Sequence, residues 1–124
     1  MATNLLNDAR ARVPVDVALA QRSESNFYAA FDGTVGIFWA TYEPIPVGTR
    51  VSVTLILPGG VELVRDAVAN WERGPVEDGW PGVGLQFEEL DSHLLDRIRS
   101  FARFREPMYV PARSLRREAY AQAM

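Results

Sequence analysis

Short stretches in which apolar and polar residues alternate, each ended by glycine or proline, constrain this sequence more than any other feature. Side chains of a β-strand point alternately to its two faces, so a period of two predicts half-buried strands. Val13, Val15, Val17 and Leu19 begin the series, and Pro14 places this first strand at an edge or at a strand entrance. The pattern predicts six strands, at residues 13–20, 26–30, 35–41, 50–57, 61–71 and 82–87.

The breakers between these segments indicate tight turns. Residues 58–60 read Pro-Gly-Gly, and successive glycines supply the positive φ angles that a hairpin turn needs. Gly36 lies inside the third strand, where a glycine marks a bulge or a close approach of backbone. The fifth segment is long enough to bend or bulge near Arg65 and Asp66, and Trp71 at its end is predicted to be a core residue.

The period changes after residue 90. Leu94, Ile98 and Phe101 recur at helical spacing, Asp91 or Ser92 is a suitable N-cap, and a proline at position 107 ends the segment. The sequence therefore predicts a mainly β fold, a six-stranded antiparallel β-barrel followed by a C-terminal α-helix. A chain of 124 residues fits one domain, with an N-terminal arm at 1–12, barrel and helix at 13–105, and a C-terminal extension at 106–124.

Composition excludes several classes of function. The chain has no cysteine and one histidine, His93, which excludes disulfides, thiol nucleophiles and sites built from thiolates or several histidines. No apolar run approaches the roughly 18 residues of a membrane helix, and no secretory signal is visible. We expect a cytoplasmic protein that does not insert into a membrane.

Neither catalysis nor nucleic-acid binding is expected. No serine lies in a Gly-x-Ser-x-Gly elbow, and a chain without lysine has no Gly-Lys-Ser/Thr phosphate loop. Residues 1–90 carry six arginines and twelve acidic residues, whereas residues 91–124 carry seven arginines and four acidic residues. An acidic body with a basic end is a poor match for a nucleic-acid backbone. No cofactor and no metal are expected.

Six short segments occur in the order typical of PilZ domains. They are Arg-Val-Pro-Val at 12–15, Gly-Ile-Phe at 36–38, Pro-Val-Gly-Thr-Arg-Val at 46–51, Leu-Pro-Gly-Gly at 57–60, Val-Ala-Asn-Trp at 68–71 and Gly-Val-Gly-Leu-Gln-Phe at 82–87. The chain resembles this family over roughly residues 8–105. The resemblance implies a six-stranded barrel and a role in bacterial signalling, usually with cyclic di-GMP as the ligand.

Members of the family bind that dinucleotide with two motifs. The first is Arg-x-x-x-Arg, in the arm before the first strand, where forked guanidinium groups suit phosphates and guanine edges. Aligned on the Val-Pro that follows, the second arginine is Arg12, and the first position holds Asp8. Arg10 lies nearby but at the wrong spacing. A carboxylate beside a ligand with two phosphates is repulsive.

The second motif is Asp/Asn-x-Ser-x-x-Gly. Aligned on Gly36, its polar positions hold Phe31 and Gly33. A shifted register gives Asp32, Thr34 and Gly36, which have similar chemistry but are one residue short. On a strand, a slip of one residue sends side chains to the opposite face.

These departures predict a PilZ-like regulatory adaptor with a degraded cyclic di-GMP site, which acts through contacts with other proteins of a motility or signalling system. The alternative is a functional cyclic di-GMP receptor. In that case the ligand would be bound by Arg10, Arg12, Asp32, Thr34 and Gly36.

Candidates for protein contacts lie late in the sequence. Trp80, in a Gly-Trp-Pro-Gly loop, either anchors a partner or folds back on its own barrel. The C-terminal extension either packs on its own barrel or docks on a second chain. Docking or dimerisation is favoured, and a homodimer formed in this way would be symmetric. Its contact candidates are Tyr109, Leu115, Arg116 and Tyr120.

Overall fold

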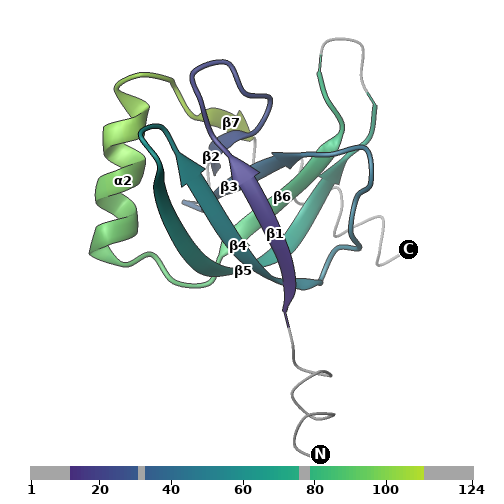
Figure 1. Cartoon of the computed structure of the whole chain (residues 1–124). Coiled ribbons are helices and arrows are strands. Elements are labelled where there is room, and N and C mark those ends of the chain that lie inside the picture. The colour runs from purple at the N-terminus through teal and green to yellow at the C-terminus, as the bar shows by residue number, and fades with distance from the viewer. Residues whose placement is uncertain (1–11, 31–32, 76–78, 111–124) are drawn as a thin grey trace, which may run out of the picture.

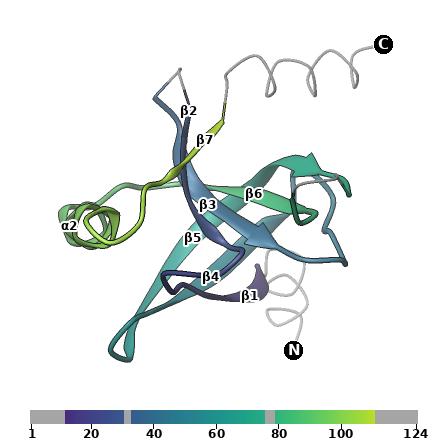
Figure 2. The same cartoon turned by 90° about the horizontal axis from the view of Figure 1, so that it is seen from above.

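Seven strands and one helix make up the computed structural model, which describes residues 12–30, 33–75 and 79–110 (Figure 1). The strands pair into one sheet in the order β1-β4-β5-β6-β3-β2-β7, and the sheet is curled rather than flat (Figure 2). Helix α2 packs beside it. The elements are β1 (Val13–Ala18), β2 (Asn26–Ala30), β3 (Val35–Ala40), β4 (Arg50–Leu57), β5 (Val61–Arg73), β6 (Gly82–Phe87), α2 (Ser92–Ala102) and β7 (Met108–Val110).

The six strands predicted from the period of two are all present. The predicted bounds of β2, β4 and β6 are confirmed to the residue. β1 and β3 end one or two residues earlier than predicted, and β5 continues to Arg73. Gly59 and Gly60 turn the chain between β4 and β5 with φ angles of 86° and 81°, which confirms the predicted turn.

The prediction of six antiparallel strands closed into a barrel is not confirmed. β1 runs parallel to β4, with Val13 opposite Val51, and a seventh strand, β7, runs parallel to β2, with Met108 opposite Tyr28. β1 and β7 are the two outer strands, and among the described residues they do not pair with each other. A period of two reveals the faces of a strand but neither its direction nor its neighbour. A strand of three residues is too short to show a period at all.

The main core lies between the inner face of the sheet and α2. The helix contributes Leu94 and Phe101, which are 0% and 5% exposed, and the Phe101 ring meets Phe27 edge-on at 5.7 Å between centroids. Asp91 caps the helix by accepting a hydrogen bond from the Leu94 amide, as the sequence predicts. The strand residues of this core with 0% exposure are Ile37, Val51, Val53, Leu55, Ala67, Val83 and Leu85.

A β-bulge in β5 builds a second, smaller cluster on the outer face. Ala69 lies opposite Leu85, but Trp71 lies opposite Gly84, so one extra residue separates the two pairs. The extra residue turns Trp71 away from the main core. There it packs with Tyr28 and Phe38, and these two side chains are fully buried. Trp71 is buried, as predicted for a core residue, but in this outer cluster.

Glycines make room for the outer aromatic rings. A Cβ atom at Gly84 would lie 2.1 Å from the Trp71 ring, and one at Gly36 would lie 2.6 Å from the Tyr28 ring. The close approach predicted at Gly36 is confirmed. Of the bend or bulge predicted near Arg65 and Asp66, the bulge is not found there, because pairing between β4 and β5 is continuous.

Candidate functional site

Arg12, the arginine that the family resemblance assigns to cyclic di-GMP, is bound by the protein itself. It directly precedes β1, whose parallel pairing places it beside β4. Its guanidinium donates to the backbone carbonyls of Val51 and Ala67 at 3.5 and 3.4 Å. It also forms ion pairs with Asp66, at 3.3 Å, and with Glu88. The Arg12 side chain is only 15% exposed.

The consequence for ligand binding is direct. A guanidinium has five N–H donors in a fixed plane, and Nε and Nη1 of Arg12 already face two carboxylates and two carbonyls. A phosphate group that bound these two nitrogens would have to displace their partners, and the two carboxylates nearby would repel it. In this arrangement Arg12 holds β1 to β4, β5 and the residue that follows β6.

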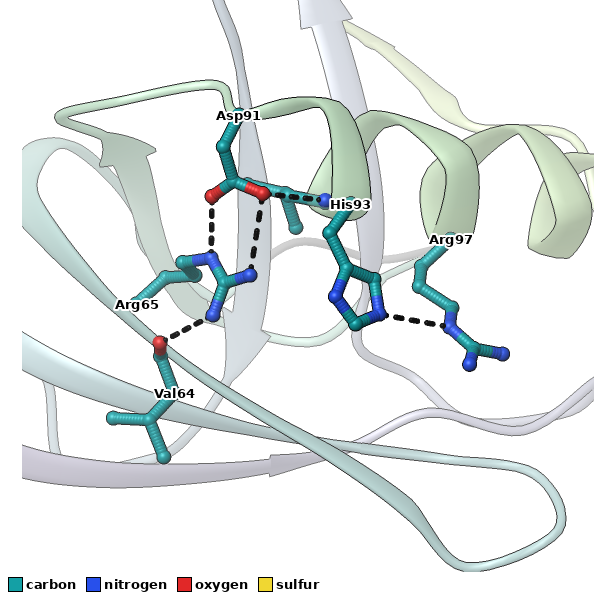
Figure 3. Close-up of polar contacts among 6 residues, drawn as sticks. Val64, Arg65, Asp91, His93 and Arg97 are labelled. Carbon is teal, nitrogen blue, oxygen red and sulfur yellow. Dashed lines mark hydrogen bonds and ion pairs between the residues drawn. The ribbon is translucent and has the colours of Figure 1, made fainter.

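A second arginine, Arg65, pairs with the N-cap of α2 (Figure 3). Its Nε lies 2.7 Å from Oδ2 of Asp91, its Nη2 lies 3.2 Å from Oδ1, and its Nη1 donates to the Val64 carbonyl at 2.8 Å. Oδ1 of Asp91 also accepts from the Leu94 amide at 2.9 Å. The hydrogen bond from Arg65, helped by the one from Leu94, holds the pKa of Asp91 below its usual range. Asp91 therefore stays a carboxylate and fastens the start of α2 to β5.

Carboxylates line the surface between these two arginines. A hollow of about 440 Å³ is bordered by Val64 and Arg65 and by four acidic residues, which we call the acidic hollow: Asp66, Glu88, Glu89 and Asp91. Within the ranges that the structure describes, no three acidic or histidine side chains come together as a metal site would require. Arg65, which lines the hollow, is paired with Asp91, and Arg12 is paired with Asp66 and Glu88, so the surface is unsuited to an anionic ligand.

The second predicted motif lies at the same end of β6 as Arg12. Gly36 pairs with Gln86, two residues before Glu88, which binds Arg12. The Thr34 carbonyl accepts the Ala30 amide in the turn between β2 and β3. The space over Gly36 is filled by the Tyr28 ring, so this glycine serves packing.

Arg10, Asp32, Leu115, Arg116 and Tyr120 lie outside the described residues. Tyr109 lies on β7, opposite Ala29, and is 63% exposed.

Trp80 lies at the far end of the sheet from α2 and forms an exposed aromatic pair with Tyr42. The two ring centroids are 4.8 Å apart, and the side chains are 39% and 70% exposed. Arg73 fixes the Trp80 backbone by donating to its carbonyl from Nε and Nη2, at 2.9 and 2.7 Å. The Arg73 guanidinium also lies 4.5 Å from the centre of the Phe38 ring. Trp80 thus contacts its own fold and still presents a face to solvent.

Sequence reasoning missed Tyr42 and Arg73. The signal becomes visible once β3 and β6 are known to pair. Ala40 lies opposite Gly82, so the antiparallel register carries Tyr42 to the level of Trp80. The separate segments give no indication of that pairing.

Comparison with known proteins does not assign a family. No family model matches the chain. An oligoxyloglucan-reducing end-specific xyloglucanase from Emericella nidulans is 37% identical over 68 residues, which is 55% of this chain and 8% of that enzyme. The chain thus spans less than a tenth of the length of that relative. No helix among residues 12–30, 33–75 and 79–110 is long and apolar enough to cross a membrane.

Proposed function

We propose that this chain is a PilZ-like cytoplasmic regulatory adaptor of a bacterial motility or signalling system. It acts through contacts with other proteins, and its cyclic di-GMP site is degraded. The observation that carries the proposal is the state of Arg12, whose guanidinium is bound by Asp66 and Glu88 within the fold.

The placement of the two motif regions supports a relation to the family. Arg12 and the start of β3 are far apart in the sequence but lie at one end of β6, linked through Glu88 and the pairing of Gly36 with Gln86. Two motifs that contribute to one ligand site must lie close together in this way. The order of the six sequence segments is the other support.

The negative charges at that end of the sheet support the proposal that cyclic di-GMP binding is lost. Asp8 replaces the first arginine of the motif, and the acidic hollow adjoins Arg12. A dinucleotide with two phosphates would meet several carboxylates and no unpaired arginine among the residues described there. Both electrostatic repulsion and the displacement of existing ion pairs oppose binding.

The aromatic pair Tyr42 and Trp80 is the surface best suited to a protein partner. Tyrosine and tryptophan dominate the binding energy of many interfaces because each buries a large area with few rotatable bonds. Arg73 holds Trp80 in place before any partner arrives, which reduces the entropy lost on binding.

The test of the adaptor role is partner capture from bacterial cells with the full chain as bait, followed by quantitative mass spectrometry. We expect specific partners to be recovered with the wild type and reduced at least fivefold with Trp80→Ala. Val64→Ala is the matched control, because Val64 is 56% exposed but lies at the acidic hollow. Equal recovery with wild type and Trp80→Ala would contradict the assignment of this surface. Failure to recover any specific partner would contradict the adaptor role.

A further inference from the structure

A small apolar groove lies between the C-terminal end of α2 and the tip of the β4–β5 hairpin, which approach each other in Figure 1. The hairpin contributes Leu57, Pro58 and Val61, and the helix side contributes Phe101 and Phe104. Phe101 forms a wall that is 5% exposed, whereas Phe104 is 72% exposed. An exposed phenylalanine beside a concave apolar surface is typical of an interaction site.

The size of the groove restricts its occupant. Its volume is about 170 Å³, well below the roughly 300–1,000 Å³ of pockets that bind small organic ligands or cofactors. It has room for one bulky apolar side chain. A protein segment that inserts a single side chain fits this volume, whereas a nucleotide does not.

The charge around the groove restricts the occupant further. Arg97 lines it, and Arg103 directly precedes Phe104. Neither arginine forms an ion pair with any residue that the structure describes, and Arg97 donates only to His93 at 3.5 Å. Figure 3 shows this contact on α2, and both residues are exposed. Carboxylates on a partner would therefore find guanidinium groups that have no competing anion.

We infer that this groove is a docking site for an acidic amphipathic segment of a partner protein, which inserts one bulky apolar side chain between Phe104 and the hairpin. Asp or Glu residues beside that side chain contact Arg97, and Arg103, the residue before Phe104, adds positive charge at this end of the helix. The inference rests on the proposed function, because it assumes a protein partner. It concerns a separate surface, since α2 and the loop that holds Trp80 lie on opposite sides of the molecule in both views (Figures 1 and 2).

The test begins with a phage-displayed library of random 12-residue peptides selected on the full chain. We expect enriched peptides to share one Leu, Phe, Ile or Trp flanked by Asp or Glu. The most enriched peptide is then synthesised with a fluorophore, and its Kd is measured by anisotropy at 0.15 M salt. Phe104→Ala and Arg97→Glu are each expected to weaken binding at least tenfold.

Arg99→Glu is the matched control. It makes the same charge change two residues along the same helix, but Arg99 is outside the groove, is 72% exposed and lies 3.5 Å from Asp96. We expect this variant to weaken binding less than threefold, because exposed charges are screened beyond about 8 Å at this salt concentration. An absence of enrichment overturns the inference. So does a selected peptide whose Kd is unchanged by Phe104→Ala and Arg97→Glu.

Failure of this inference can be told apart from failure of the proposed function. The peptide experiment uses purified protein and tests the groove through Phe104→Ala and Arg97→Glu, whereas capture from cells compares wild type with Trp80→Ala. Partner recovery that depends on Trp80, together with no selected peptide weakened by Phe104→Ala or Arg97→Glu, would support the adaptor role and overturn the inference about the groove. Peptide binding that depends on Phe104, without any partner recovered from cells, would support the inference about the groove and contradict the adaptor role.

Discussion

Replacing Arg12 with methionine tests whether this side chain stabilises the fold or is held ready for a ligand. Methionine keeps the apolar stem of arginine, so the change removes the guanidinium and little packing. The lost contacts are the ion pairs to Asp66 and Glu88 and the hydrogen bonds to two backbone carbonyls. If Arg12 is structural, its loss must lower the free energy of unfolding.

The expected size follows from the exposure of each partner. A hydrogen bond to a charged group contributes about 1.5–3 kcal/mol when well formed. The contacts at 3.3–3.5 Å are long, and Asp66 is 58% exposed, so that pair contributes only about 0–1 kcal/mol. Glu88 is more protected, at 35% exposed. We expect a net loss of about 1–2 kcal/mol, which lowers the Tm of a domain of this size by about 4–8 °C.

The assay is thermal unfolding followed by circular dichroism, with urea denaturation as a second measure. Arg22→Met is the control, because Arg22 is exposed and forms no ion pair among the described residues. Its effect should remain within about 0.5 kcal/mol. An Arg12→Met variant as stable as the wild type, or more stable, would refute the reasoning. Residues kept for ligand binding often contribute nothing to stability or reduce it.

Three further predictions concern packing and the helix cap. Gly84→Ala places a Cβ against the Trp71 ring and should lower stability by about 1–3 kcal/mol; an unchanged urea midpoint would contradict the bulge geometry. Leu94→Ala removes the fully buried helix contact and should lower the free energy of unfolding in urea by about 2–5 kcal/mol; a loss below 1 kcal/mol would mean that α2 is loosely packed. The pKa of Asp91 is lowered in the fold, so its contribution is present above the ordinary carboxyl pKa of about 3.9 and is lost as pH falls through the lower folded value. Asp91→Asn keeps a capping side chain but should make the fall of Tm below about pH 4 shallower than in the wild type, and equal slopes would contradict the role of the pair with Arg65.

The elements of this fold are readable from the sequence because each depends on local chemistry. The bounds of β4 and β6 were predictable because apolar residues recur along each strand and a proline, Pro58 or Pro81, stands next to one of its ends. The N-cap at Asp91 follows from a short acidic side chain before a run of helical period. None of these features depends on distant residues.

The features that the sequence does not predict are those that depend on which strands pair with each other. The parallel pairing of β1 with β4 is a long-range choice that leaves no local signal. The outward turn of Trp71 depends on a bulge against Gly84, and the period of two places that side chain on the wrong face. The exposed pair of Tyr42 and Trp80 likewise needs the pairing of β3 with β6.

The sequence predicts the residue types of the candidate site but not the groups that Arg12 contacts in the fold. The resemblance singles out Arg12, and the spacing shows that Asp8 breaks the first motif. The partners of Arg12 come from β5 and from the end of β6, far along the chain. Only the folded arrangement shows that an arginine suited to phosphate is already bound by carboxylates.

The most direct test of the central claim is calorimetric titration of two proteins with cyclic di-GMP at moderate salt. One is the wild type, and the other is the triple variant Asp8→Arg, Asp66→Asn, Glu88→Gln, which supplies the missing arginine and neutralises both carboxylates on Arg12. We predict no measurable heat of binding for the wild type at ligand concentrations up to about 100 μM. For the variant we predict a Kd in the micromolar range, and each tenfold decrease in Kd corresponds to about 1.4 kcal/mol of binding free energy. Micromolar binding by the wild type would contradict the claim and favour a functional receptor. A silent variant would show that these three carboxylates are not what prevents binding.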